Sequence, residues 1–279
     1  MKGIFLVVIT GVIILIYFVC FHGTSPKVSV LKFDEKLDGR SFDFTWGDPS
    51  DPYLIDLRTR YDLEGIISSS KNDLERVEKL CHWVHGLWKH NGRNEPAKRD
   101  PISIIEEAKK GKRFRCVEYS VVLSGCLNAV GIPARVLSLR TKDMETRKSG
   151  AGHVVVEAYL RDVEKWIFVD PQWDVIPCLD GMPLNAVEFQ RMLAERKKGL
   201  GILSLSRKNA RRYFRWISPY LYYFAVKFDN RIWKTDASSK RVMLVPIGAR
   251  EPKVFQRRFP MYNVIYTHSI NSFYSEPRH

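Results

Sequence analysis

The sequence lacks the cysteine pattern of a disulfide framework or a zinc site. Its five cysteines are an odd number and include no C-x-x-C pair. Glycine and proline, at 17 and 14 residues, are too scarce for a fibrous or low-complexity chain, and no internal repeat indicates a solenoid. Hydrophobic residues make up 45% of the chain and charged residues 27%, which is the composition of a folded globular protein.

The N-terminus contains a long apolar run. Residues 4–21 (IFLVVITGVIILIYFVCF) carry no charge, and at about 1.5 Å per residue a helix of this length just crosses a hydrocarbon core of about 30 Å. The run is longer than the apolar core of a signal peptide, so we predict an uncleaved single-span membrane anchor over residues 1–22. A cleaved signal peptide, or a lipoprotein anchored through Cys20, is the alternative. Lys2 is the only charge before the run, which favours a body outside the cytoplasm.

Acidic residues are scarce as well, since 31 of them stand against 45 Lys and Arg and leave a formal net charge of +14. Residues 191–215 hold nine basic residues and one acidic residue. Such a segment favours an anionic partner, although a solvated helix and loop have the same pattern. Tyr213 and Trp216 would suit nucleic acid, but apolar residues follow them and favour a buried role. Anionic lipid or a cell-wall polymer fits a membrane-anchored chain better.

Apolar residues at i, i+3, i+4 and i+7 predict a helix that begins near Asn72 and buries one face. Cys81, His82 and His85 lie on this helix. Because Cys81 belongs to the apolar stripe and no carboxylate completes a ligand set, we predict no metal site and no cofactor. Upstream, residues 54–67 are predicted as an extended segment within a linker and N-terminal extension that covers residues 23–71.

Capping signals bound two further helices. Asp100 followed by Pro101 is typical of a helix start, and Gly111 of a helix end. Cys116 opens the next helix, which ends at Gly131. Strands and one more helix (186–197) are predicted afterwards, with the strands at residues 134–139, 153–160, 166–170, 221–228, 242–247 and 262–268. We therefore predict an α+β fold in which N-terminal helices pack on an antiparallel sheet.

Three residues at the ends of these elements could carry chemistry. Cys116 stands at a helix N-terminus, where the helix dipole stabilises a thiolate, and three basic residues between positions 112 and 115 would add to this effect. His153 opens and Asp170 closes neighbouring strands of one predicted hairpin, so Asp170 can orient the His153 imidazole. The three predict a nucleophile–base–orienter triad, although a free cysteine is commonly a buried core residue.

Three stretches around these residues resemble the transglutaminase-like superfamily, and its bacterial members most closely. They are RFRCVEYSVVLSGCLNAVGIPARVLSL, GAGHVVVEAYL and WIFVDPQW. The resemblance implies a papain-like α+β core over residues 72–180, with Cys116 as nucleophile, His153 as general base and acid, and Asp170 as orienter. Residues 181–279, a basic helical segment and the C-terminal strands, lie outside what the motifs cover.

The resemblance also implies a reaction. The Cys116 thiolate would attack a glutamine or peptide amide of a protein or peptide substrate and form a thioester, which water or an amine resolves. Eukaryotic members add an indole N–H to the oxyanion hole, and here Trp83 and Trp88 are available upstream. Trp83 lies at the edge of the apolar stripe and is the better candidate, since Trp88 lies within it. The alternative is a catalytically silent scaffold or binding module at the membrane.

Overall fold

The computed structural model describes residues 29–39, 42–234 and 240–277. The predicted membrane anchor at residues 4–21 lies outside these ranges. Within them, no helix is both long enough and apolar enough to cross a membrane.

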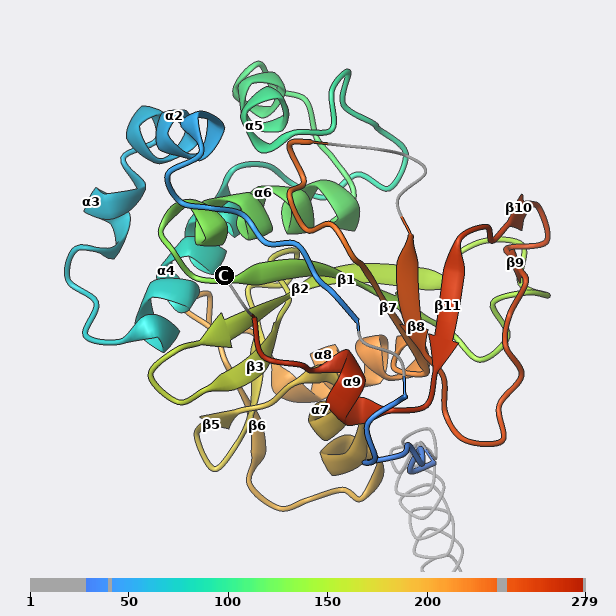
Figure 1. Cartoon of the computed structure of the whole chain (residues 1–279). Helices are drawn as coiled ribbons and strands as arrows, with labels where there is room; N and C mark the ends of the chain where they lie inside the picture. Colours follow the sequence, from blue (N-terminus) through green and yellow to red (C-terminus); the bar gives the residue numbers. More distant parts are fainter. Residues whose placement is uncertain (1–28, 40–41, 235–239, 278–279) are drawn as a thin grey trace, which may run out of the picture.

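A six-stranded sheet forms the centre of the fold, in the order β11-β8-β7-β1-β2-β3 (Figure 1). Its strands are β1 (Ala134–Arg140), β2 (Gly152–Leu160), β3 (Lys165–Val169), β7 (Tyr223–Lys227), β8 (Arg241–Leu244) and β11 (Val264–Thr267). Neighbours run antiparallel except β11 and β8, which are parallel. The expectation of a purely antiparallel sheet is therefore corrected at this edge, where a long connection through residues 245–263 lets β11 return in the direction of β8.

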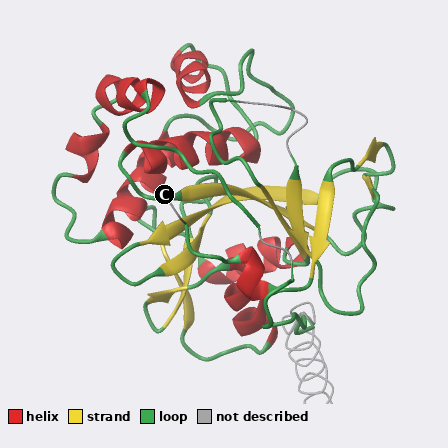
Figure 2. Cartoon of the chain, in the orientation of Figure 1, coloured by secondary structure: helices red, strands yellow, loops and turns green. Residues whose placement is uncertain are grey.

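Helices cover both faces of this sheet (Figure 2). On one face lie α2 (Pro52–Arg60), α3 (Leu63–Ile67), α4 (Asp73–Gly86), α5 (Pro101–Lys109) and α6 (Cys116–Ala129). On the other face lie α7 (Ala186–Ala194), α8 (Ala210–Ile217), the short 3-10 helix η1 (Ser218–Tyr220) and α9 (Ile270–Phe273). Each face of the sheet has its own hydrophobic core, and alternate residues of β2 point into the two cores. Val156 packs in the core beneath α6, whereas Val155 packs in the core beneath α7 and α8.

Two smaller β-structures flank the main sheet. One is a three-stranded sheet in the order β5-β4-β6, made of β4 (Ile176–Leu179), β5 (Met182–Pro183) and β6 (Leu200–Leu203). The other is a hairpin of β9 (Val254–Phe255) and β10 (Phe259–Pro260).

The expected extended segment at residues 54–67 is wrong, because α2 and α3 occupy it. Asp51 caps α2 by accepting the Tyr53 backbone N–H at 2.9 Å, and Pro52 takes the first helical position. Leu54 and Leu57, one turn apart, are fully buried. The Asp-Pro start signal is the one that marks α5, so local chemistry specifies this helix as well.

The helices predicted at Asn72, Asp100 and Cys116 are confirmed as α4, α5 and α6. The Asn72 side chain accepts the Glu75 N–H at 2.9 Å, and the Asp100 side chain accepts the Ser103 N–H at 3.0 Å. These side chains satisfy backbone donors that have no acceptor within their own helix.

The sheet continues beyond residue 180, since β7, β8 and β11 extend it from β1. The N-terminal extension also joins this body: Asp34 forms a β-bridge with Ser269, and Thr45 forms one with Asp229. The boundary expected at residue 180 therefore does not coincide with a break in the main sheet.

Candidate active site

The register of the sheet brings His153 and Asp170 together. Val169, the last residue of β3, pairs with Val156 of β2, so the next residue, Asp170, arrives near the start of β2. His153 Nε2 lies 2.8 Å from Asp170 Oδ2, and both side chains are buried. The hairpin geometry expected from the sequence is thus present.

Cys116, the first residue of α6, completes the arrangement. Its thiol is within hydrogen-bonding reach of the His153 imidazole, on which Nε2 is already directed at Asp170. Burial by itself raises the pKa of the Cys116 thiol. The His153 hydrogen bond and charge, together with the Val154 backbone N–H, overcome this effect and hold the pKa below its ordinary value of 9.0.

The pKa of the His153 imidazole is shifted upward, opposite to that of the Cys116 thiol. Burial disfavours its charged form, but the Asp170 carboxylate and the hydrogen bond to Cys116 raise the pKa of His153 to about 10. These opposite shifts of the two pKa values favour a thiolate beside an imidazolium, which is the reactive form of a cysteine nucleophile.

Exposure separates Cys116 from the other described cysteines. Cys81, Cys126 and Cys178 are buried, whereas Cys116 is partly exposed. Burial raises the pKa of the Cys126 thiol above its ordinary value, and the same cause acts on Cys81. Among the described cysteines, only Cys116 is partly exposed to solvent and has a thiol pKa below its ordinary value.

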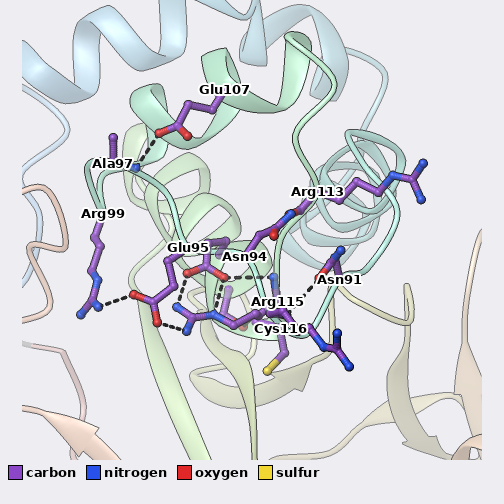
Figure 3. Close-up of polar contacts among 12 residues, drawn as sticks. Asn91, Asn94, Glu95, Ala97, Arg99, Glu107, Arg113, Arg115 and Cys116 are labelled. Carbon is purple, nitrogen blue, oxygen red and sulfur yellow. Dashed lines mark hydrogen bonds and ion pairs between the residues drawn. The ribbon is translucent and has the colours of Figure 1, made fainter.

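The basic loop before Cys116 has a different role from the one expected. Lys112 forms an ion pair with Glu107 at 2.5 Å, and Arg115 pairs with both Glu95 and Glu118. Figure 3 shows the Arg115–Glu95 pair beside the Cys116 backbone, with the Cys116 sulfur pointing away from the Glu95 carboxylate. These carboxylates compensate Lys112 and Arg115, and the charge and hydrogen bond of His153 favour the thiolate instead.

Glu118 has a structural position at the start of α6. Its carboxylate accepts the Arg115 backbone N–H at 3.1 Å and forms a second contact with the Arg115 guanidinium at 2.8 Å. These contacts to one carboxylate hold the turn that carries Cys116.

The basic segment 191–215 and the residues after it supply part of the site. Helix α8 lies on the face of the sheet opposite α6, and its Tyr213 donates a hydrogen bond to Asp170 Oδ2 at 2.9 Å. The Trp216 ring meets the His153 ring edge-on with centroids 4.8 Å apart, and the Tyr220 ring lies at 6.0 Å. Sequence reasoning missed these roles. The signal was the spacing i, i+3 and i+7 of Tyr213, Trp216 and Tyr220, which begins at the end of the basic segment.

The two upstream tryptophans lie in different surroundings. The Trp83 ring packs against Tyr61 with centroids 6.0 Å apart, and no contact of the described chain joins it to the triad. Trp88 packs against Phe114 and Tyr119, which flank Cys116 in sequence, and its buried Nε1–H has no acceptor. Of the two indoles, Trp88 is the one with a free donor near the start of α6.

The cluster of Cys81, His82 and His85 is not assembled as a ligand set. His82 Nδ1 lies 3.0 Å from Asp174 Oδ2, and His85 Nδ1 lies 3.2 Å from the Pro171 carbonyl oxygen. In the described part of the chain, no group of three or more His, Cys, Asp or Glu residues could hold a metal ion.

Comparison with known families agrees with this arrangement. Residues 63–171 match the family model of the transglutaminase-like superfamily, and they include Cys116, His153 and Asp170. This part of the chain therefore resembles a transglutaminase-like core. The resemblance noted in the sequence is thereby confirmed, and the α+β class is confirmed by the elements described above. No curated protein matches the chain.

Several solved structures are similar over part of their length. A candidate cysteine protease from Cytophaga hutchinsonii has 17% identity and a TM-score of 0.35, over 52% of this chain and 46% of its own. The periplasmic domain of TgpA from Pseudomonas aeruginosa has 19% identity and a TM-score of 0.33, over 45% and 51%. Legionella pneumophila LapG has 15% identity and a TM-score of 0.32, over 59% and 86%.

The chain thus spans less than half the length of the first of these structures. The TM-scores are low, so the family assignment rests on the match of residues 63–171.

Proposed function

We propose that this protein is a cysteine enzyme that transfers or hydrolyses acyl groups at glutamine or peptide amide bonds. The observation that carries the proposal is the position of His153, which contacts the Asp170 carboxylate with Nε2 and lies within hydrogen-bonding reach of the Cys116 thiol. A partly exposed thiolate beside an oriented imidazolium is equipped for nucleophilic attack followed by proton transfer.

In the first half-reaction, the Cys116 sulfur would form a bond to the carbonyl carbon of the amide, whose π electrons move to oxygen. As the first residue of α6, Cys116 has a backbone N–H without an acceptor inside the helix, and this donor can face the oxyanion. Trp88 Nε1–H is the second candidate donor. The intermediate collapses when the C–N bond breaks, and the His153 imidazolium gives its proton to the departing ammonia or amine.

In the second half-reaction, neutral His153 would accept a proton from water or from an incoming amine, which attacks the thioester. Departure of the Cys116 thiolate regenerates the ion pair. Water makes the enzyme a hydrolase, and a lysine amine makes it a cross-linking transferase. Asp170 keeps the imidazole in one orientation through both steps and stabilises its positive charge.

The membrane setting is part of the same proposal. Residues 4–21 would anchor the chain with the catalytic body outside the cytoplasm. The arginines of α8 (Arg211, Arg212 and Arg215) are exposed, while Tyr213 of the same helix is buried against Asp170. This division leaves the basic side of the helix available to anionic lipid or a cell-wall polymer.

The test uses the full chain in detergent with a glutamine-containing peptide and a fluorescent primary amine. We expect ammonia release, with amine incorporation if the enzyme is a transferase and without it if the enzyme is a hydrolase. Cys116→Ala should abolish both signals because it removes the nucleophile. Cys126→Ala, in the buried part of the same helix, is the matched control and should keep both.

Two outcomes would contradict the proposal. Labelling of Cys81 or Cys126 by a carboxamide electrophile as readily as Cys116 would remove the basis of the triad. Binding of the peptide without ammonia release, unchanged in Cys116→Ala, would favour the scaffold alternative.

A further inference from the structure

A second charged feature borders the proposed active site at the end of β1. Arg140 pairs with Gly152 in the β1–β2 ladder, one position from the Leu139–His153 pair. Its guanidinium covers Gly152 so closely that a Cβ on this glycine would come within 2.4 Å of Nη1. The absence of a side chain at position 152 therefore makes room for the guanidinium beside the catalytic histidine.

The Arg140 guanidinium has no anionic partner in the described ranges. Nη1 donates to the Leu139 carbonyl oxygen at 3.0 Å, and the group stacks on the Phe255 ring at 4.5 Å. No described carboxylate forms an ion pair with it. Partial burial of a guanidinium is costly unless an anion compensates it, and the group is desolvated enough to lower the pKa of Arg140 to about 10.

A second arginine reinforces this positive region. Arg241, at the start of β8, interacts electrostatically with Arg140 across the sheet and raises the cost of its charge. Arg241 also has no ion pair among the described residues, and its buried Nε–H lacks any acceptor. A guanidinium without an anionic partner matches the planar, two-oxygen geometry of a carboxylate, and the Arg241 charge adds to the positive potential at Arg140.

The region lies next to the nucleophile. The Arg140 charge interacts with the Cys116 thiol, and Tyr220 on the other side is within electrostatic range of both Cys116 and Arg147. The thiol is therefore within electrostatic range of Arg140 and of Tyr220, and the Trp216 and Tyr220 rings lie against His153.

We propose that Arg140, supported by Arg241, forms a subsite that binds a carboxylate of the acyl substrate while Cys116 attacks the nearby amide. The inference rests on the proposed function and gives its substrate class: acyl donors that carry a carboxylate close to the scissile amide. That carboxylate is either an acidic side chain or a free chain terminus.

The test compares two alkylating reagents on the full chain, iodoacetate and iodoacetamide, with Cys116 modification measured by peptide mass spectrometry. The reagents differ in carboxylate against carboxamide, so the ratio of their rates is independent of the thiolate fraction. We expect Arg140→Gln to lower the iodoacetate-to-iodoacetamide ratio about 10-fold, as the loss of a charge-assisted contact predicts. Arg140→Lys keeps the charge without the planar fork and should give an intermediate ratio.

The matched control is Arg191→Gln, which removes one positive charge from an exposed position of α7 and should leave the ratio unchanged. If Arg140→Gln does not fold, Arg241→Gln provides the second variant and should lower the ratio by about 3-fold, because it removes the supporting charge. An unchanged ratio in the folded variants, with Cys116 still alkylated, would overturn the subsite alone. Failure of Cys116 to react with either reagent would overturn the proposed function.

A second experiment with four peptide substrates then identifies the source of the carboxylate. Glutamine peptides with a neighbouring Glu or Gln, and with a free or amidated C-terminus, are compared by ammonia release. Preference for the Glu peptide assigns a side-chain carboxylate, and preference for the free terminus assigns a terminal one. Equal use of all four peptides would contradict the subsite.

Discussion

The two ends of β1 each carry an arginine, and the two arginines lie in opposite circumstances. Arg135 is fully buried, and Nε and Nη2 contact Glu157 Oε2 at 3.1 and 2.8 Å. Its Nη1 donates to the Phe273 carbonyl oxygen at 2.9 Å, and the guanidinium lies 4.4 Å from the centre of the Trp166 ring. Arg140, five residues along the same strand, has no carboxylate partner in the described structure.

The comparison distinguishes a guanidinium whose charge is compensated within the fold from one whose charge is free to bind a ligand. At the Arg135 end, every donor group has an acceptor, and the Glu157 carboxylate also accepts from Tyr274 at 2.7 Å. Such a closed network joins the C-terminal segment to the sheet and has no capacity for a ligand. At the Arg140 end, the charge is left uncompensated beside Cys116 and His153. One end of the strand therefore has a closed structural network, while the other carries an uncompensated charge beside the proposed active site.

The largest effect should come from Asp170→Asn at the catalytic end. The variant removes the charge that orients His153 and stabilises its protonated form, and acyl transfer should fall by about 10³- to 10⁴-fold. Asp170 and the hydrogen bond to Cys116 together raise the pKa of His153 to about 10, so wild-type activity that needs the imidazolium should be lost only as pH rises toward that value. In Asp170→Asn this loss should occur at lower pH.

The pH–rate profile of ammonia release checks this prediction. A variant whose alkaline limb coincides with that of the wild type would contradict the assigned role of Asp170, whatever its absolute rate.

A different kind of loss is expected at the structural end. Glu157→Gln leaves Arg135 charged, buried and without its partner, which should lower the free energy of unfolding by about 3–5 kcal/mol. Urea unfolding measures the change, and the alkylation rate of Cys116 in the folded protein should remain that of the wild type. Glu251→Gln breaks the exposed Lys253 pair instead and should change stability by less than about 1 kcal/mol. Loss of Cys116 reactivity in folded Glu157→Gln would contradict the purely structural role of the Arg135–Glu157 pair.

The smallest effect should come from Tyr213→Phe, which removes the hydroxyl that donates to Asp170 Oδ2 and keeps the packed ring. One hydrogen bond of about 1 kcal/mol corresponds to about a 5-fold fall in kcat. A positioning role also requires a shift of the pH–rate profile. Tyr53→Phe loses the comparable bond to Asp100 and is the control, with unchanged kcat expected. An identical pH profile in Tyr213→Phe and the wild type would limit Tyr213 to a packing role.

Much of the core could be predicted because its signals are local. The Asn72 and Asp100 caps bond to N–H groups three residues ahead, and the apolar stripe of α4 repeats at the helical period. The same kind of signal at Asp51 and Pro52 was present but was not recognised, and this is why α2 was expected to be extended. Asp51 needs no distant partner to cap its helix, so the signal for α2 is contained in the local sequence.

The sequence by itself determined the order Cys116, His153 and Asp170 and the element that each one opens or closes, because hydrogen-bond periodicity and capping depend on neighbours along the chain. Only the tertiary structure decided which charges are compensated. Tyr213 reaches Asp170 from 43 residues away, Glu95 and Glu118 neutralise the cation that precedes Cys116, and Arg135 finds Glu157 while Arg140 finds no carboxylate. Pairing and burial depend on contacts between distant segments, and the spacing of residues along one chain does not encode them.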